Sequence, residues 1–426
     1  MFYLFCDNLL GEGIYLFSLT GESRQLTSPP DYGDHMPAFS PDGRALAFCR
    51  LLAFSAGEIY LLPLDGGAAR PLTAYKRRSV SPVWTRDGRG ILHIFDEYRI
   101  GQREIRLIDV LDPKASWRRI PSIEDASEIS AGRHLVFSRR IQDENIWRAK
   151  LSAAGDSPSA AELFISSTRR DSIPKYSPDG KKIAFISSRT GPNEIWTSRA
   201  DGSNPVQTTF FGGPPAGGLN WSPDGQWIVF HARAEGQADV FAIPAAGGSP
   251  KRLTSHPADD TFPNYSRDGR TIYFGSARSG QFQIWKMPAS GGEAAPVIGA
   301  VGNAAIESPD GRTLYYRSGS DAQAMSIWKV PVEGGKPVEV AGPAHDWPFG
   351  FTVTPDGVYY PAPPHSGELR FIRFLNFTTG QSTPVAVASH PFVLGMSVSP
   401  DSKYLLFDQL DEIRSDLMLV ENFLPQ

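Results

Sequence analysis

The sequence predicts an all-β protein: a single β-propeller of four-stranded antiparallel blades, with about nine repeats and eight as the next choice. Three observations predict this fold. A short turn motif returns along the whole chain at intervals of about 45 residues. Each motif is followed by a segment in which polar and apolar residues alternate, as in a half-buried strand. The 426 residues also include 41 Gly and 36 Pro, enough to form the turns between many short strands.

The turn motif is an aromatic or aliphatic residue followed by Ser-Pro-Asp-Gly or a close variant. Its aspartates are Asp42, Asp87, Asp179, Asp224, Asp268, Asp310, Asp356 and Asp401. One interval, between Asp87 and Asp179, is about twice as long as the others. A degenerate copy of the motif, EISAGRHLVF, lies near its middle and predicts a further turn near residue 131. The repeats are therefore centred at positions 42, 87, 131, 179, 224, 268, 310, 356 and 401 of one domain spanning 1–426, with 1–20 as a possible surplus hairpin.

The repeat around Asp179 shows the internal pattern of a blade. Pro178 presets φ, Asp179 can bond the nearby backbone, and Gly180 accepts a positive φ, so these residues favour a tight turn. Residues 181–186 then alternate as a strand, and the pair Ile195-Trp196 marks a third strand. A short fourth strand ends in Leu-Thr in several repeats. The last repeat lacks a fourth strand of its own, so we expect residues 24–27 to close the ring against it.

Composition excludes several classes of function. The chain has 42 basic and 46 acidic residues, a formal charge of −4 and no long run of like charges, so no nucleic-acid groove is predicted. No apolar run approaches the roughly 18 residues of a membrane helix, so no membrane insertion is expected. The first residues do not resemble a secretory signal, which predicts a cytoplasmic protein, or a periplasmic one if the chain is a fragment of an exported protein.

The Ser-Pro-Asp-Gly turn, the following Lys-Lys-Ile-Ala-Phe type of strand and the Leu-Thr ending resemble the WD40-like repeats of TolB-type propellers. The resemblance covers essentially the whole chain. It implies a propeller fold, but one fold hosts many functions. In bacteria such repeats occur in the assembly component of the Tol system, beside peptidase modules, and in the sensory portions of receptors and transcription regulators. The end of the chain is similar to propellers attached to winged-helix regulators or kinases, although no effector motif is present.

Motifs for covalent chemistry are missing from the sequence. There is no Gly-x-Ser-x-Gly nucleophile motif and no phosphate- or dinucleotide-binding loop. We therefore predict no catalytic residue and no cofactor, and expect a non-catalytic scaffold that binds a protein or a small ligand. The sensory part of a signalling protein is one role of this kind. The alternatives are a metal-dependent lyase or hydrolase acting on an acidic carbohydrate, and a Tol-like periplasmic assembly protein.

The enzyme alternative depends on histidines in the loops that lead into the first strand of a blade. These are His35, His256, His345 and His390. Blade geometry places such loops on one face around the central channel, where converging imidazoles could bind a transition metal. Surface or capping roles are the simpler interpretation, and no metal is predicted.

Charged residues at fixed positions complete the candidate binding face. Asp34, Asp171 and Asp260 each precede their turn aspartate by eight residues. They could form a carboxylate ring for a basic peptide or a cation, or could bond backbone N–H groups where loop meets strand. Arginines follow the turn by nine or ten residues in three repeats, and irregular loops occur at FDEYRIGQRE, PAPPHSGELR and DQLDEIRSD. The candidate contact residues are Asp34, His35, Asp171, Arg189, Arg233, His256, Asp260, Arg278, His345, Asp346 and His390.

Overall fold

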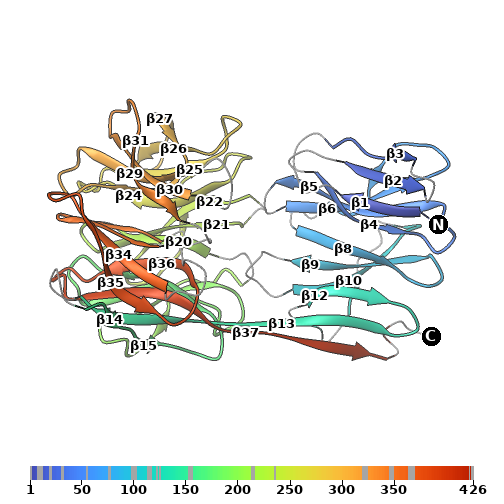
Figure 1. The fold of residues 1–426 in the computed structure, drawn as a ribbon, viewed down its shortest axis with the longest axis horizontal. Coiled ribbons are helices and arrows are strands. Elements are labelled where there is room, and N and C mark those ends of the chain that lie inside the picture. The colour runs from blue at the N-terminus through green and yellow to red at the C-terminus, as the bar shows by residue number, and fades with distance from the viewer. Residues whose placement is uncertain are drawn as a thin grey trace. The chain divides into compact units, whose positions relative to one another are not determined.

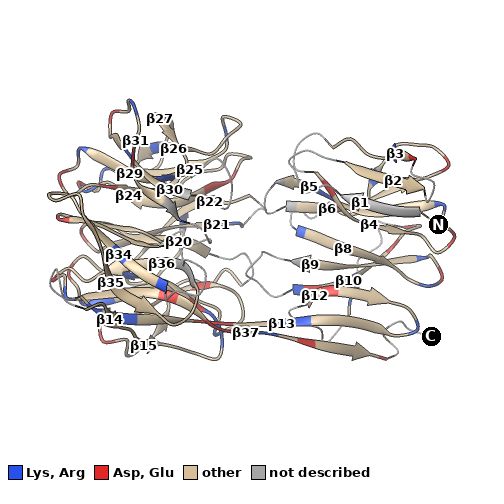
Figure 2. Cartoon of the chain, in the orientation of Figure 1, with Lys and Arg blue, Asp and Glu red and all other residues tan. Residues whose placement is uncertain are grey.

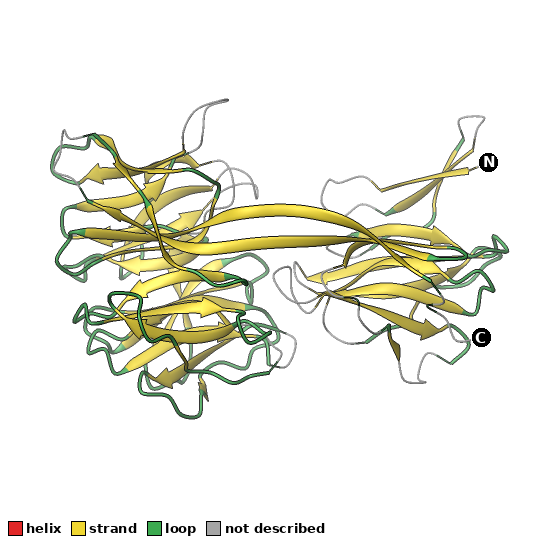
Figure 3. Ribbon diagram, turned by 90° about the horizontal axis from the view of Figure 1, so that it is seen from below, coloured by secondary structure: helices red, strands yellow, loops and turns green. Residues whose placement is uncertain are grey.

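The computed structural model confirms the all-β class: every element of the described residues is a strand (Figures 1 and 3). The structure describes residues 2–6, 13–18, 22–29, 33–53, 56–74, 78–96, 103–112, 118–120, 123, 126–151, 157–212, 216–234, 237–318, 325–344, 350–362, 370–421 and 423. In this part of the chain, no helix is long and apolar enough to cross a membrane.

The chain divides into two compact units instead of one ring of nine repeats. Unit 1 comprises residues 1–141 and 413–426, and unit 2 comprises residues 142–412. The boundary falls within two long strands, β13 (Leu135–Lys150) and β37 (Tyr404–Val420). A single closed ring of nine blades is therefore not confirmed. Sequence periodicity records how often a sheet recurs, but it does not record where the sheets close on themselves.

Unit 1 begins with the predicted hairpin, in which β1 (Phe2–Cys6) pairs with β2 (Ile14–Ser18). β3 (Ser23–Gln25) adds to the same sheet through β2, so the expected pairing of residues 24–27 with the last repeat is wrong. The next strands are β4 (Asp34–Phe39), β5 (Ala45–Ala53), β6 (Ala56–Pro63) and β7 (Arg70–Pro71), then β8 (Arg78–Trp84), β9 (Gly90–Asp96), β10 (Arg103–Asp109), β11 (Arg118–Arg119) and β12 (Ala126–Ala131).

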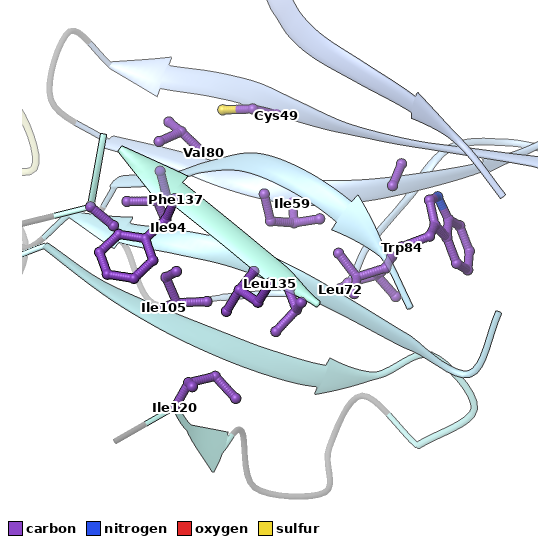
Figure 4. Packing of buried hydrophobic residues seen from close by; sticks show 14 of the residues in the cluster. Cys49, Ile59, Leu72, Val80, Trp84, Ile94, Ile105, Ile120, Leu135 and Phe137 are labelled. Carbon is purple, nitrogen blue, oxygen red and sulfur yellow. The ribbon is translucent and has the colours of Figure 1, made fainter. Parts of the chain in front are cut away.

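The core of unit 1 lies between the flat faces of these sheets (Figure 4). Ile59, Ile94 and Ile105 come from strands of two successive repeats and are fully or almost fully buried. Leu135 and Phe137 of β13 pack onto the same cluster. Apolar side chains at alternating positions thus hold neighbouring sheets face to face, as the strand patterns predict.

Unit 2 contains four complete sheets in chain order, each with its strands in the order first to fourth. They are β16 (Asp171–Tyr176), β17 (Lys182–Ser187), β18 (Glu194–Arg199) and β19 (Val206–Gln207); β20 (Ala216–Trp221), β21 (Trp227–Ala232), β22 (Asp239–Pro244) and β23 (Lys251–Arg252); β24 (Asp260–Tyr265), β25 (Thr271–Ser276), β26 (Gln283–Pro288) and β27 (Ala295–Val301); and β28 (Asn303–Glu307), β29 (Thr313–Ser318), β30 (Met325–Pro331) and β31 (Val338–Ala344).

Two further sheets of unit 2 combine distant parts of the chain. β32 (Thr352–Thr354), β33 (Gly357–Pro361), β34 (Arg370–Asn376) and β35 (Ser382–Ala388) are joined by β14 (Ser159–Ala160). In the other, β36 (Phe392–Val398) and β37 supply the first two strands, and β13 and β15 (Glu162–Ile165) supply the third and fourth. The innermost strands contact one another in the cyclic order β16, β20, β24, β28, β32, β36 and back to β16. Strands from both ends of unit 2 therefore share the sheet that closes its ring.

The predicted turn motif has one recurring hydrogen-bond pattern. Ser177 Oγ donates to Asp179 Oδ1 at 2.6 Å and accepts the backbone N–H of Lys182 at 2.9 Å, while Asp179 Oδ1 accepts the N–H of Lys181. The hydroxyl bond and the backbone bond lower the pKa of Asp179 below its usual value of 3.8. The same serine-to-aspartate bond occurs at Ser40, Ser222, Ser266, Ser308 and Ser399.

In β4, β16, β20 and β24 the third residue of the strand sits in a β-bulge with left-handed backbone. Ile173 has a φ of 53° and Phe262 a φ of 50°, values that are uncommon for a β-branched or a bulky residue. The register of each strand shifts at this point, between Ser172 and Lys175 in β16 and between Thr261 and Asn264 in β24. At Ile173 and Phe262 the backbone N–H of the bulged residue donates to a side chain of the preceding sheet.

Candidate functional site

The loops before each first strand and after each second strand lie at the same end of an antiparallel sheet. We call this end of unit 2 the loop face. Acidic and basic residues are interspersed over the strands and loops, without a block of one sign (Figure 2). The chemistry of the loop face therefore depends on how individual charges are paired.

The structure places two of the predicted aspartates of unit 2 in buried ion pairs within their own sheets. Asp171 is fully buried, and both of its carboxylate oxygens accept hydrogen bonds from Arg189 Nη2, at 2.8 and 2.9 Å. Asp260 is likewise fully buried, and its Oδ2 accepts from Arg278 Nη2 at 2.5 Å. Each arginine follows its aspartate by 18 residues, from the end of the second strand. These side chains neutralise each other at the rim of the channel.

Unit 1 repeats this arrangement. Asp34 is fully buried and binds Arg50 Nε and Nη2, both at 2.7 Å. Arg50 was not among the predicted contact residues, although its spacing from Asp34 is close to that of the other two pairs. A recurring separation of 16 or 18 residues between an aspartate and an arginine was the signal that could have found these pairs.

The arginines of these pairs also cover the aromatic residues of the second and third strands. The guanidinium of Arg189 lies 5.4 Å from the ring centre of Phe185 and 5.1 Å from that of Trp196. Arg278 lies 5.3 Å from Phe274 and 4.8 Å from Trp285. Cation–π contacts of this kind stabilise a planar guanidinium in one orientation.

Arg233 departs from the pattern, because its sheet has Ala216 where the others have aspartate. It reaches the next repeat instead, where Nη1 and Nη2 bind Asp259 at 2.6 and 2.8 Å. Nearby, Asp239 is fully buried and accepts from Arg252 Nη2 at 2.7 Å. Burial raises the pKa of Asp239 to about 6 in spite of this arginine.

The predicted histidines are divided between the two units. His35 belongs to unit 1, whereas His256 and His390 belong to unit 2. His256 Nδ1 accepts the backbone N–H of Ala258 at 3.0 Å, as a local loop cap. His345 and Asp346 lie outside the described residues. Among the residues that the structure describes, no group of three His, Cys, Asp or Glu side chains could hold a metal ion.

His390 contacts a serine and an aspartate, but not as a catalytic triad. Ser389 Oγ lies 3.0 Å from His390 Nδ1, and Asp411 Oδ1 lies 3.9 Å from the same nitrogen. In a serine hydrolase, the serine and the carboxylate contact opposite nitrogens of the imidazole. With both groups on Nδ1, the imidazole cannot pass a proton from serine while the carboxylate orients it.

Asp411 instead organises a polar cluster on β13 and β37. It accepts Trp147 Nε1 at 3.0 and 3.1 Å, Asn145 Nδ2 at 2.9 Å and Gln409 Nε2 at 3.1 Å. The segment DQLDEIRSD, expected to be a loop, is part of β37. It is a strand because it pairs with β13, a partner that the local sequence does not reveal. The other two irregular loops fall largely outside the described residues.

The loop face also presents an aromatic residue that the sequence analysis did not single out. Phe210, which follows the fourth strand β19, is 76% exposed. Its neighbour Phe211 packs edge-on against Phe230 and Phe241, with ring centres 5.8 and 5.7 Å apart. The backbone N–H of Gly212 donates to the buried Glu194. Both contacts fix the loop and leave the Phe210 ring in solvent.

Comparison with known proteins agrees with this fold. Residues 215–360 match the TolB β-propeller domain family. A TolB homolog of Chlorobium luteolum is 27% identical over 140 residues, which are 33% of this chain and 30% of the relative. An uncharacterized protein of Agrobacterium fabrum is 34% identical over 176 residues, 41% of this chain and 43% of the relative. The matches thus span less than half the length of these two relatives.

A solved structure has the same fold. The structure described as a putative TolB from Agrobacterium tumefaciens aligns with 64% of this chain and 99% of its own, with a TM-score of 0.50 and 19% sequence identity. At that identity the likeness shows the fold alone. The predicted resemblance to TolB-type propeller repeats is confirmed.

Proposed function

We propose that this protein, a TolB-type β-propeller, is a non-catalytic binding module whose loop face on unit 2 receives a protein partner. The observation that supports this most directly is the exposure of Phe210. Exposed aromatic residues held on a rigid base are typical anchors of protein interfaces, because they bury a large area at a small cost in side-chain entropy. The Phe211 packing supplies such a base.

The charges of the loop face agree with a binding role. Arg189, Arg233 and Arg278 have side chains only 13–18% exposed, and each is paired with an aspartate. Paired, oriented charges give a partner specific hydrogen-bond positions without a strong net field. A general base or nucleophile would instead need a side chain poised beside an acceptor of its proton, and the Ser389–His390 contact does not provide this geometry.

A Tol-like assembly role in the periplasm is a second candidate. It is favoured by the similarity to the TolB homolog of Chlorobium luteolum. It uses the same kind of surface, and therefore makes the same prediction for Phe210. It differs in requiring export, which labelling of the full-length protein in separated cell compartments would test.

A site-specific cross-linking experiment tests the binding role. A photoreactive phenylalanine analogue is placed at position 210, and in a matched variant at position 227. Trp227 is also an exposed aromatic residue, 39% exposed, but it begins β21 at the opposite, turn end of its sheet. In an extract of the source organism we expect discrete protein adducts at position 210 and none at 227. The same adducts at both positions, or none at 210, would contradict the proposal.

The non-catalytic half of the proposal is tested separately. The purified protein is incubated with fluorogenic peptides and with polygalacturonate, with and without added Mn²⁺. We expect no turnover above that of the heat-denatured protein. Saturable turnover that is lost on His390→Ala substitution would overturn this half and favour the carbohydrate-acting enzyme.

A further inference from the structure

Four tryptophans of unit 2 occupy the same place in their sheets. For Trp328 in β30, the loop after the second strand lies outside the described residues, so the other three sites are the ones that can be compared. Trp147, Trp196 and Trp285 each follow an isoleucine in the third strand, within β13, β18 and β26. Trp196 pairs across the sheet with Phe185, and Trp285 with Phe274. Corresponding side chains in a repeated sheet face equivalent surroundings, so differences between the three sites are informative.

The residue four positions after the second-strand phenylalanine decides what each indole contacts. In the sheet of Trp147 this residue is Asp411, which follows Phe407, and its carboxylate accepts the indole N–H. In the other two sheets it is an arginine, Arg189 or Arg278, whose guanidinium lies over the indole ring. One sheet therefore supplies its own carboxylate to the indole, and the other two do not.

The indole N–H groups of Trp196 and Trp285 are left without an acceptor. Among the described residues, both Nε1 atoms are buried and have no hydrogen-bond partner. Trp196 as a whole is only 8% exposed. A buried polar group without a partner destabilises the fold, and buried indoles usually find an acceptor. These donors therefore indicate positions where an acceptor from outside the described chain belongs.

The neighbouring arginines offer further donors. Arg189 uses Nη2 for Asp171 and Nε for Ser187 Oγ, and no described residue bonds its Nη1. Arg278 uses Nη2 for Asp260 and Nε for Ser276 Oγ in the same way. The Arg189 side chain is 18% exposed and that of Arg278 14%. Each site thus combines an indole N–H with guanidinium N–H groups that can still be reached.

We propose that Trp196 with Arg189, and Trp285 with Arg278, are two carboxylate-binding sites for acidic side chains of a peptide partner. The Asp411–Trp147 contact shows which acceptor suits this indole position, because the chain itself places a carboxylate there. A carboxylate also accepts stronger hydrogen bonds from a guanidinium than a neutral carbonyl does. The proposal rests on the proposed binding function and specifies an acidic partner for it.

The test observes the indole N–H groups directly. Nitrogen-15-labelled full-length protein is titrated at constant ionic strength with the peptide acetyl-(Glu-Gly)₃-amide. The (Gln-Gly)₃ and (Lys-Gly)₃ peptides serve as neutral and basic controls. We expect saturable shifts of the Trp196 and Trp285 Nε1–H resonances with the glutamate peptide only, and none at Trp147. Shifts of all three indoles, equal shifts with the glutamine peptide, or no shift at Trp196 would overturn the proposal, the last result being expected if water alone occupies the site.

Matched variants give a second measurement. Trp196→Phe keeps the ring and removes the donor, and should weaken binding of the glutamate peptide about tenfold, the effect of one charge-assisted hydrogen bond. Trp147→Phe removes the donor that Asp411 already occupies and should leave the affinity unchanged. Equal effects of the two substitutions would contradict the assignment. If cross-linked adducts form at position 210 but the peptide titration shows no shift, the proposal of carboxylate-binding sites is wrong and the proposed binding function still stands.

Discussion

Asp408 Oδ2 accepts a hydrogen bond from the backbone N–H of Ile173 at 2.6 Å, although the two residues are 235 positions apart. The bond joins β37, the second strand of the sheet that closes the ring of unit 2, to the innermost strand β16 of the next sheet. Asp408 Oδ1 accepts a second buried N–H, from Gly395, at 2.9 Å. His231 makes the equivalent contact two sheets further on, where its Nδ1 accepts the N–H of Phe262 at 3.2 Å. In both cases a side chain of the second strand satisfies the bulged backbone of the next sheet.

Removal of the Asp408 side chain should therefore weaken the contact that closes the ring of unit 2. Asp408→Ala leaves two buried N–H groups without an acceptor, and we expect it to lower the free energy of unfolding of unit 2 by about 2–5 kcal/mol. Asp408→Asn retains one acceptor oxygen and should cost less. Urea unfolding followed by hydrogen exchange of β16 and β36 measures both variants. An unchanged midpoint for Asp408→Ala would show that the bond does not hold the closure together.

The sequence predicted the elements of each sheet because their causes are local. The Ser-Pro-Asp-Gly turn carries its hydrogen-bond partners within five residues, as at Ser177, Asp179 and Lys182. The alternation of the second strand and the position of Trp196 in the third are local in the same sense. These features could be identified from one repeat and transferred to the others.

The division into two units and the candidate site depend on long-range pairing, which the local pattern does not contain. β13 and β37 extend through the unit boundary because each pairs with the other, and nothing near Asp411 in the sequence indicates β13 as its partner. The exposure of Phe210 likewise depends on Phe211 finding Phe230 and Phe241. The ion pairs were predicted in part. Asp171 and Arg189 were both predicted as contact residues, but their pairing with each other was not predicted.

The turn motif makes a prediction about acidity. Ser177→Ala removes the hydroxyl that contributes most to lowering the pKa of Asp179, so that pKa should rise towards its usual value of 3.8. A carboxyl group with a lowered pKa stabilises the fold above its unfolded pKa, and this contribution is lost as the pH falls. NMR titration of the carboxyl carbon measures the shift. Ser222→Ala, which changes the turn of Asp224, is the control and should leave the Asp179 titration where it is.

His231 predicts a loss of stability on mild acidification. Burial lowers its pKa from 6.5 to about 3, so the folded protein keeps the imidazole neutral while the unfolded chain takes up a proton below pH 6.5. The stability of unit 2 is therefore fully present above pH 6.5 and falls as the pH drops from there towards 3, at about 1.4 kcal/mol per pH unit. His231→Gln should flatten this dependence in unit 2, as seen by unfolding at a series of pH values.

A matched histidine in unit 1 provides the control for that experiment. Burial also lowers the pKa of His93 to about 3. His93→Gln should flatten the pH dependence of unit 1 and leave that of unit 2 unchanged, when hydrogen exchange reports the two units separately. If His231→Gln left the slope of unit 2 as it was, protonation of the imidazole could not be the cause of the acid sensitivity.

The threonine that follows the fourth strand β19 predicts a specific dependence on a hydroxyl group. Thr209 is 1% exposed, and its Oγ1 accepts the backbone N–H of Ile195 at 2.8 Å and donates to the buried Glu194. Thr209→Val keeps the shape but leaves both partners unsatisfied, and should lower the free energy of unfolding by about 2–4 kcal/mol. Thr209→Ser keeps the hydroxyl and loses one methyl group, at a cost of about 1 kcal/mol. The urea unfolding midpoints of the two variants test this prediction. If the two variants were equally stable, or if the valine variant were more stable, packing and not hydrogen bonding would account for threonine at this position.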